Sequence, residues 1–194
     1  MEPANVFLQD FKGSGALLEG HFVLSSGLHS QQYLQCAIAL EKTSDALRYG
    51  RAIAELFQVG SIDVVASPAI GGLVIGFATA AAMGKRFLWT ERENGVMTLR
   101  RGFKVAQGER ILVVEDVITT GGSTRECINA LREGGAEIIG AASIVDRSNG
   151  GAEVGVPRSS LLILEVPTYE PRDCPLCAAG LEAIKPGSRT VVGK

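Results

Sequence analysis

The chain has 194 residues, of which 46% are hydrophobic and 21% are charged, and its 19 basic and 21 acidic residues give a net charge of −2. This length allows one domain with a sizeable core and leaves no room for a second full-size catalytic domain. The balanced charge and the lack of a polybasic run argue against nucleic acid or an anionic membrane as a partner.

The sequence also lacks the features of a secreted or membrane-spanning protein. Residues Met1 to Asp10 do not have the basic and then apolar layout of a signal peptide. The longest apolar stretch, Leu73 to Met83, is interrupted by Gly76 and Thr79 and is too short to cross a bilayer. We therefore expect a cytoplasmic protein.

Predicted helices and strands alternate along the chain. Apolar spacing and capping residues predict helices near 5–11, 43–58, 71–83 and 123–132. Extended segments are expected at 21–24, 33–37, 62–66, 86–90, 111–114, 138–145 and 161–166. Residues 91–108 are polar and basic and predict a loop or a loose hairpin, and the tail from Pro171 is expected to be irregular. This alternation indicates an α/β fold with a mainly parallel sheet, which binds ligands at the carboxyl ends of its strands.

The most informative segment follows the strand at 111–114, where Glu115-Asp116 leads into Val117-Ile118-Thr119-Thr120-Gly121-Gly122-Ser123-Thr124. Gly121 and Gly122 allow backbone N–H groups to converge, and a helix that starts here adds unpaired N–H groups and a positive dipole end. The threonine and serine hydroxyls can donate further hydrogen bonds. The pattern indicates a phosphate monoester site, and the spacing of Ser123 and Glu126 predicts a capping box.

The acid pair at the strand end adds a second function to this segment. Side chains alternate along a strand, so Glu115 and Asp116 need not point the same way. Beside a phosphate, two carboxylates can accept hydrogen bonds from ribose hydroxyls and stabilise positive charge on a sugar. The alternative is a glycine- and threonine-rich turn without a ligand. Neither a Walker A loop nor a dinucleotide fingerprint is present.

Residues Val113 to Thr124 resemble the PRPP-binding motif of type I phosphoribosyltransferases, and within that family Glu115 to Ser123 is similar to the orotate enzymes. Three further segments agree, in the order of the family. Leu24 to Ser30, with Tyr33, resembles the orotate segment of the family. Ser67 to Gly72 resembles its pyrophosphate loop. Val145 to Arg147 resembles the strand end that carries its orotate-binding arginine.

The resemblance implies a type I phosphoribosyltransferase fold, in which a mainly parallel five-stranded sheet is flanked by helices and carries a small hood. It implies one domain over 1–194, with the hood at about 1–40, the core at about 41–170 and an irregular tail. The implied reaction transfers ribose 5-phosphate from PRPP to orotate, giving orotidine 5'-monophosphate and pyrophosphate in UMP biosynthesis. Mg2+ on PRPP near Glu115 and Asp116 is implied, as is a homodimer that shares a flexible loop between subunits.

The resemblance also implies roles for single residues. PRPP binding falls to Glu115, Asp116, Val117, Ile118, Thr119, Thr120, Gly121, Gly122 and Ser123. Glu115 and Asp116 would hold the ribose hydroxyls as catalytic residues, and Thr120 to Ser123 would hold the 5-phosphate. Thr119, Arg147 and backbone groups near Tyr33 would contact orotate. Without the other matching segments, Arg147 would be interpreted as a surface arginine in a polar turn.

The chain departs from the family at three places. Many members carry a lysine where this chain has Ser25, and another where it has Gly71. Residues 91–104 lack the histidine of the family's mobile loop and contain a single lysine, Lys104. Arg92 occupies the position of the catalytic loop arginine, and Arg100 and Arg101 either supply compensating charge or form a solvated basic face.

The four cysteines are Cys36, Cys127, Cys174 and Cys177. Cys174 and Cys177 have the spacing of half a zinc site, but no second cysteine pair accompanies them. A zinc ion shared across a dimer and a redox pair are both conceivable, and structural thiols are the favoured interpretation. For His29, a structural hydrogen bond is favoured over catalysis.

Two other functions remain open. A phosphoribosyltransferase for another base would carry a similar PRPP loop. A regulator with the same fold would bind PRPP as an effector, although such proteins usually add a DNA-binding module or a basic face, and this chain has neither.

Overall fold

The computed structural model describes residues 4–24 and 26–186. The helices are α1 (Ala4–Gly13), α2 (Cys36–Ala39), α3 (Thr43–Ala54), α4 (Gly72–Met83), α5 (Gly122–Glu133) and α6 (Pro175–Ala178), with short 3-10 turns η1 (Val59–Ser61) and η2 (Pro171–Asp173). The strands are β1 (Leu17–Val23), β2 (His29–Leu34), β3 (Val64–Pro68), β4 (Arg86–Glu93), β5 (Val96–Leu99), β6 (Arg110–Ile118), β7 (Glu137–Asp146), β8 (Arg158–Ile163) and β9 (Thr168–Tyr169).

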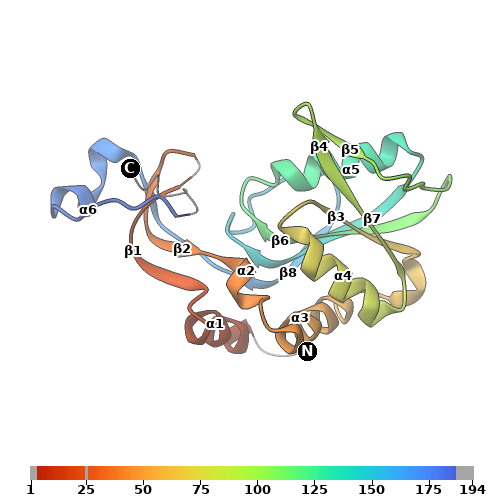
Figure 1. The fold of residues 1–194 in the computed structure, drawn as a ribbon, viewed down its shortest axis with the longest axis horizontal. Coiled ribbons are helices and arrows are strands. Elements are labelled where there is room, and N and C mark those ends of the chain that lie inside the picture. The colour runs from red at the N-terminus through yellow and green to blue at the C-terminus, as the bar shows by residue number, and fades with distance from the viewer. Residues whose placement is uncertain (1–3, 25, 187–194) are drawn as a thin grey trace, which may run out of the picture.

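A six-stranded sheet in the order β5-β4-β3-β6-β7-β8 forms the centre of the protein (Figure 1). β4, β3, β6, β7 and β8 are parallel, and β5 joins β4 as an antiparallel hairpin. The predicted α/β fold with five parallel strands is therefore confirmed. Residues 91–99 form the hairpin that was one of the two interpretations of segment 91–108.

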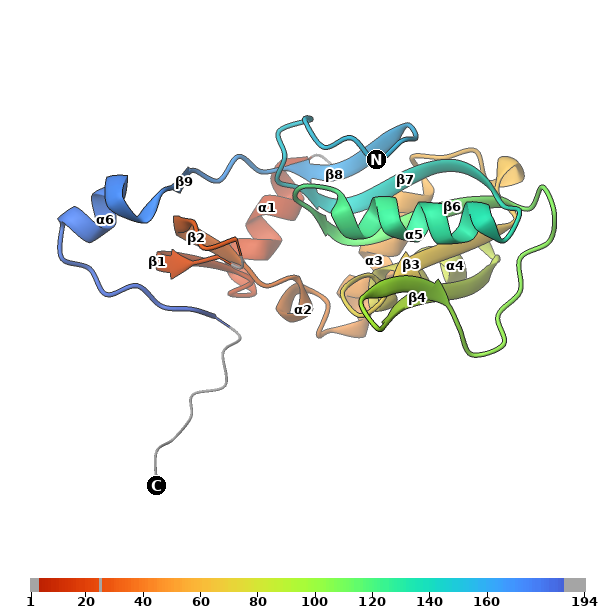
Figure 2. The same cartoon turned by 90° about the horizontal axis from the view of Figure 1, so that it is seen from above.

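Both faces of this sheet are covered, so alternate residues of the central strands enter two different cores. Val65, Leu112 and Val114 pack with the core of α1, α3 and α4, whereas Val64, Ile111 and Val113 pack with the core under α5. Figure 2 shows α5 on one face of the sheet and α3 and α4 on the other. Strands buried on both faces read as continuous apolar runs, which is why these segments were recognisable in the sequence.

Close packing around α3 explains two local features of the sequence. Gly50 lets α3 approach α4, because a Cβ at this position would lie 2.5 Å from the carbonyl carbon of Ala78. Phe7 and Phe11 of α1 are buried against Tyr49, with ring centroids 5.6 and 6.0 Å away. The helix predicted near 5–11 is confirmed, and its two phenylalanines face the core.

A second sheet stands apart from the first, in the order β1-β2-β9 (Figure 1). Its last strand comes from the C-terminal segment, which the sequence did not predict. The extended segment expected at 33–37 is wrong beyond Leu34, because the helical turn α2 starts at Cys36. The tail contains η2 and α6, so the expectation of an irregular tail is also wrong there. None of the helices in the described part of the chain is both long and apolar enough to cross a membrane.

Candidate active site

The carboxyl end of β6 and the start of α5 build a phosphate-sized cradle. Gly121 precedes α5 in the left-handed region, with φ at 73°, and its missing side chain leaves room for Val154, whose Cγ1 would lie 2.7 Å from a Cβ. The helix starts at Gly122 and has no side-chain cap. The predicted capping box of Ser123 and Glu126 is therefore wrong, and the first N–H groups of α5 stay available to a ligand.

The predicted PRPP segment lines this cradle almost completely. A small hollow of about 70 Å³ is lined by Glu115, Val117, Ile118, Thr119, Thr120, Gly121, Gly122, Ser123 and Thr124. Of the nine residues predicted to bind PRPP, only Asp116 is outside this lining. Thr119, Thr120 and Ser123 are exposed, so their hydroxyls can reach a ligand.

Glu115 and Asp116 differ in their surroundings, as expected for neighbours on a strand. Glu115 is buried, with 6% of its surface exposed. Its pKa is raised to about 9, mainly because of this burial and to a smaller extent because of the nearby Asp116. Asp116 is half-buried, and its Oδ1 accepts a hydrogen bond of 2.8 Å from the backbone N–H of Val117. At neutral pH and without a ligand, Glu115 is therefore protonated in the folded protein.

The loop between β3 and α4 lies directly against these two carboxyl groups. A Cβ on Gly71 would lie 2.7 Å from Oδ1 of Asp116, and one on Gly72 would lie 3.2 Å from Oε1 of Glu115. The predicted pyrophosphate loop and the predicted ribose-binding acids are thus neighbours. Gly71 replaces a family lysine at a point where Asp116 occupies the side-chain space. Ser25, the other lysine position, lies outside the described residues.

Arg147 follows β7 and is held beside the same strand end, because its backbone N–H donates a hydrogen bond of 2.8 Å to the carbonyl of Ile118. Burial lowers the pKa of Arg147, and nearby Tyr33 and Cys36 oppose that shift. Its Nε is buried and has no hydrogen-bond partner among the described residues. Tyr33 of β2 and Arg147, which were predicted to share a substrate, are therefore brought near each other.

The arginines of the β4–β5 hairpin and the loop that follows it all pair with glutamates. Arg92 forms an ion pair of 2.5 Å with Glu126 of α5. Arg100 and Arg101 pair with Glu93 and Glu91, at 3.1 and 2.7 Å. In this arrangement each of these arginines is paired with a glutamate, and none of them lines the cradle. Exposed ion pairs are weak, so these arginines can exchange their glutamates for other anions.

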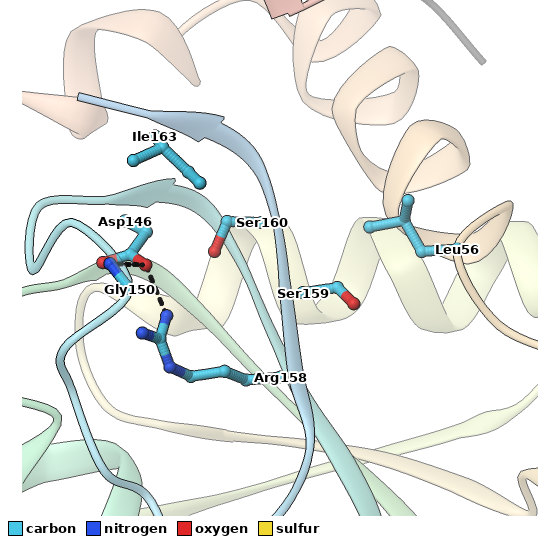
Figure 3. A pocket seen from close by; sticks show the side chains of 7 residues that line it. All are labelled: Leu56, Asp146, Gly150, Arg158, Ser159, Ser160 and Ile163. Atoms are coloured by element: carbon cyan, nitrogen blue, oxygen red, sulfur yellow. Dashed lines mark hydrogen bonds and ion pairs between the residues drawn. The ribbon is translucent and has the colours of Figure 1, made fainter.

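A wider hollow of about 450 Å³ lies beside the edge strand β8 (Figure 3). Its ionic groups already bind each other, because Arg158 forms an ion pair of 2.5 Å with Asp146. This hollow is larger than the cradle, but it lacks the converging N–H groups and carboxylates of the β6–α5 turn. We therefore place the candidate active site at the cradle.

The family relationships agree with this geometry. Residues 45–163 match the family described as the phosphoribosyl transferase domain. A protein of Pelotomaculum thermopropionicum named orotate phosphoribosyltransferase is 51% identical over 93% of this chain and 95% of its own length.

Two solved structures are also similar. Orotate phosphoribosyltransferase from Aeropyrum pernix has a TM-score of 0.68 and 29% identity, and the match covers 83% of this chain and 93% of that one. The Mycobacterium tuberculosis orotate phosphoribosyltransferase, in complex with PRPP, has a TM-score of 0.63 and 26% identity, covering 83% of this chain and 95% of that one. The chain therefore belongs to the phosphoribosyltransferase family, and within it to the orotate phosphoribosyltransferases.

Proposed function

We propose that this protein transfers ribose 5-phosphate from PRPP to orotate, giving orotidine 5'-monophosphate and pyrophosphate for pyrimidine biosynthesis. The observation that carries the proposal is the arrangement of three parts at one strand end. They are the N–H-rich cradle of residues 117–124, the acid pair and the buried Nε of Arg147, which has no hydrogen-bond partner in the part of the chain that the structure describes. An arginine fork suits the carboxylate of orotate. We also propose the cytoplasm as the location.

In this reaction the protein would mainly position the two substrates and stabilise the charges that develop on them. The cradle from Thr120 to Ser123 would hold the 5-phosphate through backbone N–H groups and hydroxyls. Glu115 and Asp116 would accept hydrogen bonds from the ribose hydroxyls and stabilise positive charge that develops as the bond from C1 to pyrophosphate breaks. Arg147, Thr119 and the backbone near Tyr33 would orient orotate, whose N1 is the nucleophile.

Mg2+ fits the donor set of this site. Carboxylate oxygens are the ligands that Mg2+ prefers, and Glu115 and Asp116 are the carboxylates beside the predicted pyrophosphate loop. Bound together with PRPP, the ion would neutralise charge on the leaving pyrophosphate.

Arg92 is proposed to supply a further positive charge to pyrophosphate. Its ion pair with Glu126 involves two half-exposed side chains, with 47% and 44% of their surfaces accessible. Such a pair costs little to break, so Arg92 can exchange Glu126 for a phosphate group when the loop closes. In the homodimer that we propose, this arginine would act in the partner subunit's active site.

An exposed apolar stripe on and before α4 supports the proposed homodimer. Ile70, Val74 and Phe77 are spaced as one helical face and are 84%, 48% and 62% exposed. We expect Phe77→Glu to convert a dimer into a monomer, because a charge would be buried in the interface. Light scattering on the two proteins measures this. Ile163→Glu, which changes an exposed residue outside the stripe, is the control, and an unchanged mass for Phe77→Glu would place the interface elsewhere.

The activity is tested by mixing the protein with PRPP and Mg2+ and following the loss of orotate absorbance, with uracil, hypoxanthine and adenine in parallel. Turnover with orotate alone is the expected result. Turnover with another base, or PRPP binding without turnover, would favour the alternative transferase or the regulator.

Arg147 provides a sharper test of substrate choice. We expect Arg147→Ala to raise the KM for orotate by a factor on the order of 10 to 100, since a charge-assisted bidentate contact would be lost. The KM for PRPP should change much less. Steady-state kinetics in both substrates separates these effects, and equal losses for the two substrates would contradict the assignment.

A further inference from the structure

Four potential metal ligands from distant parts of the chain meet next to the β1–β2 hairpin. His21 lies on β1, His29 starts β2, and Cys174 and Cys177 come from the turn that begins α6. One ligand atom from each residue lies within 4.8 Å of all the others. The chain contains only two histidines, and both are in this cluster.

The hydrogen bonding of His21 prepares one nitrogen for a metal. Its Nδ1 lies 2.8 Å from the carbonyl oxygen of Leu181, and because a carbonyl only accepts hydrogen bonds, Nδ1 carries the proton. Nε2 therefore presents a lone pair to the cluster. Metal-bound histidines commonly have this second contact, which fixes the tautomer and the ring orientation.

The other three ligand atoms converge on that lone pair. Nε2 of His21 lies 2.8 Å from Nδ1 of His29, 3.6 Å from Sγ of Cys174 and 3.7 Å from Sγ of Cys177. Sγ of Cys177 is 3.3 Å from Nδ1 of His29. A tetrahedral zinc ion with ordinary bond lengths separates sulfur and nitrogen ligands by about 3.4 to 3.8 Å.

We propose that His21, His29, Cys174 and Cys177 bind one structural Zn2+ ion in a closed Cys2His2 site. The two sulfur distances to Nε2 of His21, 3.6 and 3.7 Å, already fit this range, and the distance of 3.3 Å between Sγ of Cys177 and Nδ1 of His29 is slightly short of it. The two histidine nitrogens must separate by about half an ångström to reach the tetrahedral spacing. Binding replaces the two thiol protons, which are released to solvent, so two thiolates balance the charge of the ion. All four ligands come from one chain, so the ion need not be shared across a dimer.

The site has a clear structural purpose, because it ties the C-terminal segment to the hairpin. The segment already contacts both edges of the hairpin, through β9 on β2 and through reciprocal backbone hydrogen bonds of 2.8 Å that join Ile184 to His21 and Val23. Both views show α6 beside this small sheet and away from the main core (Figures 1 and 2). Leu181 and Ile184 are more than half exposed, so apolar burial contributes little and a metal would hold the segment in place.

Two other uses of the cluster make different predictions. Without a metal, Nδ1 of His29 would donate a hydrogen bond to Nε2 of His21, and the thiols would be spectators. A redox pair would form a disulfide between Cys174 and Cys177, which are both reduced in this structure. Neither use requires the four ligand atoms to be mutually close, whereas a zinc ion does.

The first experiment measures metal content in the full-length protein after reduction, loading with Zn2+ and gel filtration into metal-free buffer. We expect about one zinc ion per chain. Cys174→Ser with Cys177→Ser should lose it. Cys127→Ala, which removes a cysteine of the core under α5, should retain it. Cys177→Ser alone guards against misfolding as the cause of loss, because this side chain is exposed and not needed for packing.

Cobalt provides a readout of the ligands themselves. Co2+ in place of Zn2+ should give the intense visible bands of a tetrahedral complex and a thiolate-to-cobalt charge-transfer band, both absent from the double variant. A chelator should lower the Tm of the wild type by several degrees and leave that of the double variant unchanged. Equal metal content in wild type and double variant would overturn the proposal, as would a Cys174–Cys177 disulfide in a protein whose reduced form binds no zinc.

Discussion

Replacing Glu115 by Gln and Asp116 by Asn together is expected to lower kcat by a factor on the order of 10² to 10³, while the 5-phosphate cradle remains able to bind PRPP. The variant removes both carboxyl groups, which would stabilise positive charge on the ribose in the transition state once Glu115 has lost its proton on binding PRPP with Mg2+. Removal of a single preorganised electrostatic contact in other enzymes has effects of this size. The N–H groups at the start of α5 are unchanged, so the Kd for PRPP should rise far less than kcat falls.

The fold should survive the change at Glu115, and pH provides the check. The pKa of this buried carboxyl is raised to about 9, so it is protonated in the folded protein at neutral pH without PRPP. In the unfolded chain it ionises near pH 4.3, so the free energy of unfolding falls as pH rises from about 4 to 9. Glu115→Gln cannot ionise and should be more stable than the wild type at pH 8.

Rapid-quench turnover and PRPP titration by calorimetry measure the first prediction, and urea unfolding at pH 5 and pH 8 measures the second. Thr98→Ala, at a half-buried position of β5, serves as a control variant that leaves the acid pair intact. An unchanged kcat for the double variant would remove the carboxylates from the proposed mechanism. A Glu115→Gln protein that loses stability at pH 8 would show that the carboxyl is ionised in the folded state.

The cradle was predictable from the sequence because its information is local. The segment from Ile111 to Thr124 contains, in order, an apolar strand, two acids, two glycines and the start of a helix. The geometry of these parts follows from the alternation of side chains along a strand and from the helix dipole. The capping box failed for a local reason as well. The left-handed Gly121 takes the N-cap position two residues before Ser123, so Ser123 falls inside α5.

Contacts between distant segments were not predictable. The sequence shows Cys174 and Cys177 as half of a metal site, but the other half is His21 and His29, about 150 residues earlier, on strands whose register brings both rings together. The turn α2 replaces an expected strand because the chain must leave the hairpin and enter α3. The glutamate partner of Arg92 lies on a helix 34 positions later, which no spacing rule reveals.

Arg158→Met should destabilise the protein by about 3 to 5 kcal/mol, the usual cost of leaving one partner of a buried ion pair alone. Only 13% of the Arg158 side chain and 2% of the Asp146 side chain are exposed. Figure 3 shows Arg158 reaching the Asp146 carboxylate. Arg158 also donates a hydrogen bond of 2.8 Å to the carbonyl of Ala152 and one of 3.2 Å to Ser148, so it holds the loop after β7. Methionine keeps the length of the side chain and removes the charge.

The pH dependence identifies the pair as the cause of this loss. Burial alone would raise the pKa of Asp146, but hydrogen bonds from Arg158 and Ser148 outweigh burial and hold the pKa below its ordinary value. A lowered pKa in the folded state stabilises the protein above the unfolded value near 3.9 and loses that effect as pH falls further. The wild type and Arg158→Met should therefore differ most at neutral pH and converge in acid.

Urea unfolding between pH 3 and pH 7 tests this, with Arg101→Met as the matched control. Arg101 pairs with Glu91 at 2.7 Å, but 61% of its side chain is exposed, so its loss should cost far less stability than the loss of Arg158. Arg147 is the neighbour of Asp146 in the chain. Arg158→Met should therefore also raise the KM for orotate more than it lowers kcat. Equal destabilisation by both methionine variants would mean that burial does not strengthen the Asp146–Arg158 pair.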